Sequence, residues 1–249
     1  MKTILNYHLR ERVNTIDFLN ALAPKEFERF IDPFCGSANV WMHLPNKASV
    51  LSDLNGRFID VLETVQKDCD GLIKALDIHK EKYGWKYFGT VKKKPYHEDR
   101  TQRAANWIFL NKCSHQEYFR FNGAGLFLGA WGDLQFCPPL YDLADLHWAK
   151  VKLQNTHLNV GDFESTIDAS KEGDFLYIHP PAKLDNANWK QDFTNADYER
   201  LAASLVRAGK RGVKFFIVAS KSGWTNGLFM KLKFKHTPLS PSEEGWFNY

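Results

Sequence analysis

Short apolar runs recur along the chain, and each run ends at polar or small residues. Between these runs, apolar positions recur at helical spacing. The runs are rich in β-branched and aromatic residues, which favours strands, and they predict strands over residues 27–32, 47–51, 156–160, 175–178 and 213–219. Strands that alternate with helices are typical of a three-layer α/β fold with a mostly parallel sheet.

The intervening segments predict helices over residues 7–23, 38–44, 58–65, 71–82, 104–110 and 194–208. In the last of these, Thr194 is a suitable N-cap, Asp197 follows three residues later, and Gly209 is expected to end the helix. Residues 229–237 and the last residues of the chain predict an edge hairpin.

Two segments do not follow the alternation of strands and helices. Residues 84–100 are polar and basic, with three consecutive lysines at Lys92, Lys93 and Lys94, and they are expected to form a loop or linker. The lysines fit either a phosphate-contacting loop or a solvated surface. Residues 111–141 are rich in glycine and aromatic residues, which indicates an irregular insertion that is a plausible recognition element.

The apolar run at 175–178 is followed directly by His179-Pro180-Pro181-Ala182. Proline cannot continue a ladder of hydrogen bonds and restricts the residue before it, so the strand must end there. In an open α/β sheet, ligands bind just beyond the carboxyl ends of the strands. These four residues are therefore the first place to expect a site.

Acidic residues stand at three other predicted strand ends. Asp32 ends the first strand and leads into a turn of small residues at Gly36-Ser37, where backbone can approach a ligand closely. Asp53 follows Gly36 by seventeen positions, close to the spacing at which α/β folds hold ribose hydroxyls. Asp162 follows the strand at 156–160. All of them are expected to face one edge of the sheet.

Bulk composition excludes few classes of protein. The 249 residues include 44% hydrophobic and 25% charged residues, as in ordinary globular proteins. The net charge of +4 is compatible with nucleic acid binding but does not indicate it. The four cysteines match no zinc or disulfide pattern, so no metal site is expected and the thiols are interpreted as reduced. No apolar run is long enough to cross a membrane, and no membrane partner is expected.

Several ordered blocks together resemble the Dam-type DNA adenine-N6 methyltransferases, over roughly residues 27–218. The stretch at 30–38 resembles the family's acid-Pro-Phe motif with its glycine turn, and 52–55 resembles its acidic motif. Residues 111–132 resemble its recognition region, Gly161-Asp162-Phe163 stands at its Asp-Phe position, and 193–201 resembles the helix after the catalytic loop.

The resemblance implies a Rossmann-like S-adenosylmethionine-dependent methyltransferase fold. It implies a catalytic part formed by residues 1–67 and 151–249, and an inserted target-recognition segment at 68–150. S-adenosyl-L-methionine would be held by Asp32, Phe34, Gly36, Ser37, Asp53, Asp162 and Phe163. Double-stranded DNA is the implied partner, contacted by Arg120, Asn122 and the three lysines at 92–94. The expected location is the cytoplasm of a bacterial or phage-infected cell.

The sequence departs from the family at the catalytic tetrapeptide. The family has Asp-Pro-Pro-Tyr where this chain has His179, Pro180, Pro181 and Ala182. The family's acid accepts a hydrogen bond from the target amino group and accommodates the positive charge that develops there, and the aromatic residue stacks on the flipped base. A neutral imidazole supplies no carboxylate charge, and alanine has no stacking face. Residues 6–12 also lack the glycine and lysine of the family's cofactor-covering stretch.

Three hypotheses about function follow. The first is an S-adenosylmethionine-dependent DNA adenine-N6 methyltransferase with an unusual catalytic motif and impaired activity. The second is a catalytically silent relative that binds DNA, a protein partner or a second copy of itself. The third is a methyltransferase-fold enzyme with a different acceptor, for which His179 is the base.

Overall fold

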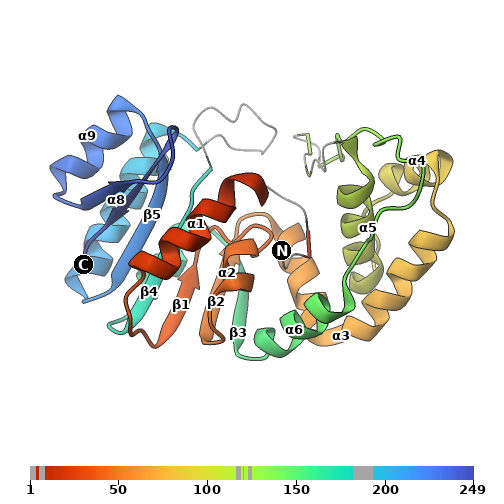
Figure 1. Ribbon diagram of the computed structural model, residues 1–249, viewed down its shortest axis with the longest axis horizontal. Coiled ribbons are helices and arrows are strands. Elements are labelled where there is room, and N and C mark those ends of the chain that lie inside the picture. The colour runs from red at the N-terminus through yellow and green to blue at the C-terminus, as the bar shows by residue number, and fades with distance from the viewer. Residues whose placement is uncertain (1–3, 6–8, 116–118, 120, 123–124, 182–192) are drawn as a thin grey trace.

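A single sheet with the strand order β3-β2-β1-β4-β5-β7-β6 forms the centre of the molecule (Figure 1). The computed structural model describes residues 4–5, 9–115, 119, 121–122, 125–181 and 193–249, with residues 9–15 described by their backbone alone. The strands are β1 Arg29–Asp32, β2 Ala48–Asp53, β3 Thr156–Val160, β4 Asp174–Ile178, β5 Lys214–Ser220, β6 Lys235–Pro238 and β7 Glu243–Phe247. The predicted α/β sheet is confirmed.

The direction of the strands determines which residues meet at the site. Strands β1 to β5 are mutually parallel, so their carboxyl ends lie at one edge. Strand β7 is antiparallel to β5, and its first residue, Glu243, pairs with Ser220 at the end of β5. An acidic residue from the last strand is thereby placed at the same edge as the ends of the parallel strands.

The side chains of each strand alternate between two apolar layers, one on each face of the sheet. Phe30, Phe175 and Tyr177 pack with residues from α1 Leu9–Leu22, α2 Asn39–His43, α3 Gly56–Glu81 and α6 Leu143–Leu153. Ile31 and Leu176 point to the opposite face and pack with α7 Phe163–Asp168, α8 Asn195–Lys210 and α9 Gly223–Lys231. Successive residues of a strand face opposite sides, so each buried strand contributes to both layers.

A helical lobe extends from one side of the sheet (Figure 1). Helix α3 continues past the sheet and packs along α5 Arg100–Cys113, and α4 Trp85–Lys93 packs against α5. The segment that follows α5 is irregular in its described part, with isolated bridges between Ser114 and Trp131 and between Phe121 and Phe127. The expectation of an irregular segment at 111–141 is confirmed there.

The predicted loop at 84–100 was wrong, because it contains α4 and the first residue of α5. Phe88 and Val91 are three residues apart and buried on one face of α4, a spacing obscured by the surrounding lysines. The predicted helices at 58–65 and 71–82 are confirmed as the two arms of α3, which meet at a kink at Asp68, where φ is −144° and ψ is 52°. The Asp68 carboxylate accepts the hydroxyl of Thr101 at 2.7 Å.

The boundaries of other predicted elements also differ from those in the structure. The capping box of Thr194 and Asp197 is confirmed at the start of α8, but the helix continues past Gly209 to Lys210. Residues 229–231 belong to α9, so the predicted hairpin is limited to β6 and β7. Helices α6, α7 and α9 were not predicted.

The predicted division of the chain falls within helices. The boundary at 67/68 lies at the kink of α3, and the boundary at 150/151 lies inside α6. The inserted segment is therefore joined to the sheet through the kinked helix α3 and through α6, and its independence as a unit stays a prediction. None of the helices in the described ranges is both long and apolar enough to cross a membrane.

The buried His79 of the helical lobe predicts a pH dependence of stability. His79 is 3% exposed, stacks on Phe109 with ring centroids 4.7 Å apart, and lies 3.0 Å from the hydroxyl of Tyr87. Burial lowers the pKa of His79 to about 4 from its ordinary 6.5. The unfolded chain binds a proton below about 6.5 and the folded chain only below about 4, so stability falls as pH decreases through this window.

We expect the free energy of unfolding to lose about 2 kcal/mol through His79 between pH 7.5 and pH 5. Urea unfolding gives the free energy of unfolding of the wild type and of His79→Gln at both pH values. The decrease between the two pH values should be larger in the wild type than in the variant by this amount. His147→Gln, at an exposed position, is the control and should match the wild type. An equal pH dependence in all three proteins would contradict the prediction.

Candidate functional site

The turn after β1 contributes backbone and an acid to the carboxyl edge of the sheet. Asp32 is 1% exposed, and its Oδ1 accepts the backbone N–H of Phe34 at 3.0 Å. Gly36 has a φ of +50°, a conformation that favours glycine. The hydroxyl of Ser37 is buried and has no hydrogen-bond partner among the described residues. The turn therefore combines a buried acid, a left-handed glycine and a buried hydroxyl directly after β1.

Asp53 joins the turns after β1 and β2. Its Oδ2 accepts the N–H of Gly36 at 2.8 Å, and its Oδ1 accepts the N–H of Asn55 at 2.8 Å. The backbone carbonyl of Asp53 also accepts the N–H of Gly161, which follows β3. Hence three adjacent strand ends are held by one residue, and the structure brings the predicted acids of β1 and β2 together.

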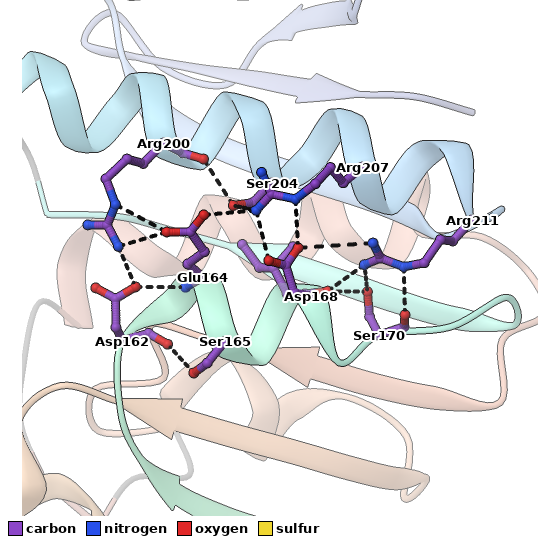
Figure 2. Close-up of polar contacts among 10 residues, drawn as sticks. Asp162, Glu164, Ser165, Asp168, Ser170, Arg200, Ser204, Arg207 and Arg211 are labelled. Carbon is purple, nitrogen blue, oxygen red and sulfur yellow. Dashed lines mark hydrogen bonds and ion pairs between the residues drawn. The ribbon is translucent and has the colours of Figure 1, made fainter.

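Asp162 is the N-cap of α7 and contacts α8 as well (Figure 2). Its Oδ1 accepts the N–H of Glu164 at 3.0 Å and a guanidinium N–H of Arg200 at 2.8 Å. Arg200 also contacts Glu164, which is shared with Arg207. Hydrogen bonds from Arg207 and then Arg200 lower the pKa of Glu164. A ladder of ion pairs thus fixes α8 against α7 beside the predicted cofactor residue.

Three phenylalanines converge at the ends of β1 and β3. Phe34 and Phe163 are stacked with ring centroids 5.2 Å apart, and Phe193 contacts them at 5.6 and 5.7 Å. The guanidinium of Arg200 lies over the ring of Phe163, 4.9 Å from its centroid. Phe163 is 5% exposed as a result. The two aromatic residues predicted to bind a cofactor therefore bind each other.

His179 contacts a carboxylate and a hydroxyl through its two ring nitrogens. Nε2 lies 3.3 Å from Oε1 of Glu243, and Nδ1 lies 3.3 Å from the hydroxyl of Tyr177. The side chains of His179 and Glu243 are 15% and 16% exposed, so the pair is largely removed from water. Pro180 is buried and Pro181 exposed, and Ala182 lies outside the described residues.

These contacts determine where the imidazole proton lies. An ionised carboxylate only accepts hydrogen bonds, so the proton of a neutral imidazole belongs on Nε2, facing Glu243. Nδ1 then accepts from the hydroxyl of Tyr177, a residue with no exposed surface. The basic nitrogen of His179 consequently points toward the core rather than toward the edge of the sheet.

The residues predicted to contact DNA lie in the helical lobe and have different roles. Lys92 donates to the backbone carbonyl of Gly129 at 2.8 Å, whereas Lys93 and Lys94 are exposed at the end of α4. The side-chain oxygen of Asn122 accepts the N–H of Leu126 and closes a turn. Arg120 lies outside the described residues. Lys92 and Asn122, two of the predicted DNA contacts, thus make hydrogen bonds within the lobe.

Arg57 organises the interior of the lobe, and sequence reasoning missed it. Its guanidinium lies 3.9 Å from the ring centroid of Phe121 and within 6 Å of those of Tyr96 and Trp107. Such cation–π contacts gain strength when they are desolvated. No local pattern indicates this cluster, because Arg57 is separated from its aromatic partners by about 40 to 65 positions. Glu243 and Arg200 were missed for the same reason.

An open cavity of about 560 Å³ lies between the lobe and the ends of β2 and β3. Its lining includes Arg57, Asp60, Arg103 and Val160. Arg103 forms two hydrogen bonds with the carboxylate of Asp60, at 2.8 and 3.2 Å. Asp60 and Arg103 of the wall are therefore paired with each other. The described residues contain no cluster of ligands that would hold a metal ion.

Comparison with known families identifies the class of protein that this fold and edge define. The model of the D12 class N6 adenine-specific DNA methyltransferases matches residues 13–243. The chain belongs to this family, and its fold is the α/β methyltransferase fold with a seven-stranded, mostly parallel sheet. The predicted resemblance and fold class are confirmed.

Relatives from phages, archaea and bacteria share this similarity. The DNA N-6-adenine-methyltransferase of Escherichia phage P1 is 26% identical over 86% of this chain, which spans 29% of that protein. The type II methyltransferase M.MjaIII of Methanocaldococcus jannaschii is 29% identical over 78% of this chain and 76% of its own length. M1.LlaDCHI of Lactococcus lactis is 22% identical over 81% of this chain and 74% of its own length.

Among solved structures, the chain is similar to the rRNA methyltransferase AviRa from Streptomyces viridochromogenes. That structure, at 1.5 Å, gives a TM-score of 0.43 with 12% identity, over 99% of this chain and 89% of the other.

Membership of the D12 class implies S-adenosylmethionine and DNA as the family's substrates. The residues present fit a nucleoside in one half of the site. The glycine turn and Asp53 offer backbone and an acid where a sugar would lie. The base half does not fit as it stands, because the ring of Phe163 is already covered by Phe34, with a centroid separation of 5.2 Å, and by the guanidinium of Arg200, at 4.9 Å.

Proposed function

We propose that this chain is a DNA-binding member of the D12 class in which methyl transfer to adenine is impaired or lost. The observation that carries the proposal is the environment of His179. Where the family has a carboxylate for the target amino group, this chain has an imidazole whose two nitrogens face Glu243 and Tyr177. That imidazole therefore directs no hydrogen-bond acceptor at a target base.

The chemistry of the transfer determines how large a loss of rate we expect. As the methyl group moves to the amino nitrogen, positive charge develops there and must be accommodated by the site. An imidazole that takes up a proton would oppose this charge. Removing one preorganised electrostatic contact costs about 10² to 10³ in rate, and losing a stacking aromatic costs about 1–3 kcal/mol. Together, the substitutions at 179 and 182 account for a loss of about 10³-fold or more.

The geometry argues against the third hypothesis, in which His179 is the base for a different acceptor. A general base must present an unprotonated nitrogen to the group it deprotonates. The unprotonated Nδ1 of His179 instead faces the buried hydroxyl of Tyr177. A silent or impaired family member is therefore the better explanation.

We expect the wild-type chain to transfer labelled methyl groups from S-adenosylmethionine to adenine in duplex DNA at least about 10³-fold more slowly than an active D12-class relative. Counting the label in purified DNA measures the transfer. Turnover comparable to that of the relative would contradict the proposal.

Restoring the tetrapeptide tests the cause of the loss. The double variant His179→Asp with Ala182→Tyr should raise transfer well above the wild type, because it returns the charge and the stacking face. The matched control, His179→Asn with Ala182→Tyr, has a side chain of the same size without the charge and should raise it less. Unchanged inactivity in a double variant that binds both S-adenosylmethionine and DNA would show that the tetrapeptide is not the cause.

Binding of DNA is supported by the family and by the exposed cations at the end of α4. Each phosphate contact contributes about 0.9 to the slope of log affinity against log salt. Replacing Lys93 and Lys94 by alanine should therefore reduce that slope by about two if both contact phosphates. Fluorescence anisotropy with a labelled duplex at several salt concentrations measures it.

The matched control for DNA binding is Lys214→Ala. Lys214 is exposed at the start of β5, at the edge of the sheet opposite the carboxyl ends. It should leave the slope unchanged. Equal slopes for the wild type and the α4 variant would contradict the assignment of α4 to the DNA surface.

A further inference from the structure

The place where a nucleoside base would lie follows from the order of the strands. Strands β3, β2 and β1 are neighbours in the sheet, and Asp53 stands at the end of the middle one. An acid at this position holds ribose hydroxyls in α/β nucleotide sites. A ligand with its sugar at Asp53 therefore has its base close to the end of a neighbouring strand. The end of β3 is followed by Asp162 and Phe163, a polar and an apolar partner for a base.

Both partners are already engaged by one residue of α8. Arg200 donates to Oδ1 of Asp162 at 2.8 Å, and its guanidinium covers the ring of Phe163 at 4.9 Å. Phe34 stacks on the same ring, so that Phe163 keeps 5% of its surface exposed. Arg200 is further held by Glu164 (Figure 2) and by Asp197.

From this geometry we propose that Arg200 acts as an internal occupant of the base subsite and limits the affinity for an adenine nucleoside such as S-adenosylmethionine. The inference rests on the proposed function for the choice of ligand. To bind, the base must displace the guanidinium of Arg200 from the ring of Phe163 and share the carboxylate of Asp162 with that guanidinium. The affinity therefore includes the free energy of breaking these contacts.

The chain offers a closely matched control on the same helix. Arg207 has the same side-chain exposure as Arg200, 43%, and also pairs with Glu164. Its second partner is Asp168, at the far end of α7, in place of Asp162. Substituting either arginine removes comparable ion pairs between α7 and α8, but only the substitution of Arg200 releases the base subsite.

Titration calorimetry with S-adenosylmethionine, and separately with adenosine, tests the inference on the full chain. Arg200→Gln should bind both ligands about three- to tenfold more tightly than the wild type, since the base no longer has to break partly exposed ion pairs. Arg207→Gln should bind as the wild type does. Thermal unfolding of the two variants verifies that both are folded.

Salt provides a second readout. Ion pairs at this exposure are screened by salt, so the affinity of the wild type for uncharged adenosine should rise with salt more than that of Arg200→Gln. An Arg200→Gln affinity equal to or below that of the wild type would overturn the proposal, and so would an equal gain in Arg207→Gln. None of these outcomes depends on methyl transfer, so the failure of the proposed function and of this inference can be distinguished.

Discussion

The site depends on the carboxylate of Asp53, which binds the backbone of two turns at once. Its oxygens accept the N–H groups of Gly36 and Asn55, and its carbonyl accepts that of Gly161. Because β1, β2 and β3 are adjacent and parallel, these bonds fix three strand ends relative to one another. The rest of the edge, from Asp32 to Phe163, is positioned by this constraint together with the register of the sheet.

The acids Asp32, Asp53 and Asp162 stand at or just beyond the ends of β1, β2 and β3, in a framework that this chain shares with its family. At the end of β4, the imidazole of His179 lies 3.3 Å from the carboxylate of Glu243, which comes from the antiparallel strand β7. The impaired methyl transfer that we propose rests on this arrangement.

Much of the edge could be predicted from the sequence, because it depends on local signals. The apolar runs before Asp32, Asp53 and His179 identify strands, and parallel strands bring their carboxyl ends together. The contacts that decide the chemistry are not local. Glu243 reaches His179 because β7 is antiparallel to β5, and Arg200 reaches Asp162 because α8 packs on α7. Single-sequence patterns contain neither the register of β7 nor the rotation of α8.

The central claim is that both nitrogens of His179 are committed to internal partners. Long-range proton–nitrogen NMR of the imidazole at neutral pH tests it directly, with the signal assigned through its loss in His179→Asn. We predict a proton on Nε2, and a change in that signal in Glu243→Gln, because the carboxylate that accepts the proton is removed. A proton on Nδ1, with an unprotonated Nε2 that does not respond to Glu243→Gln, would contradict the account.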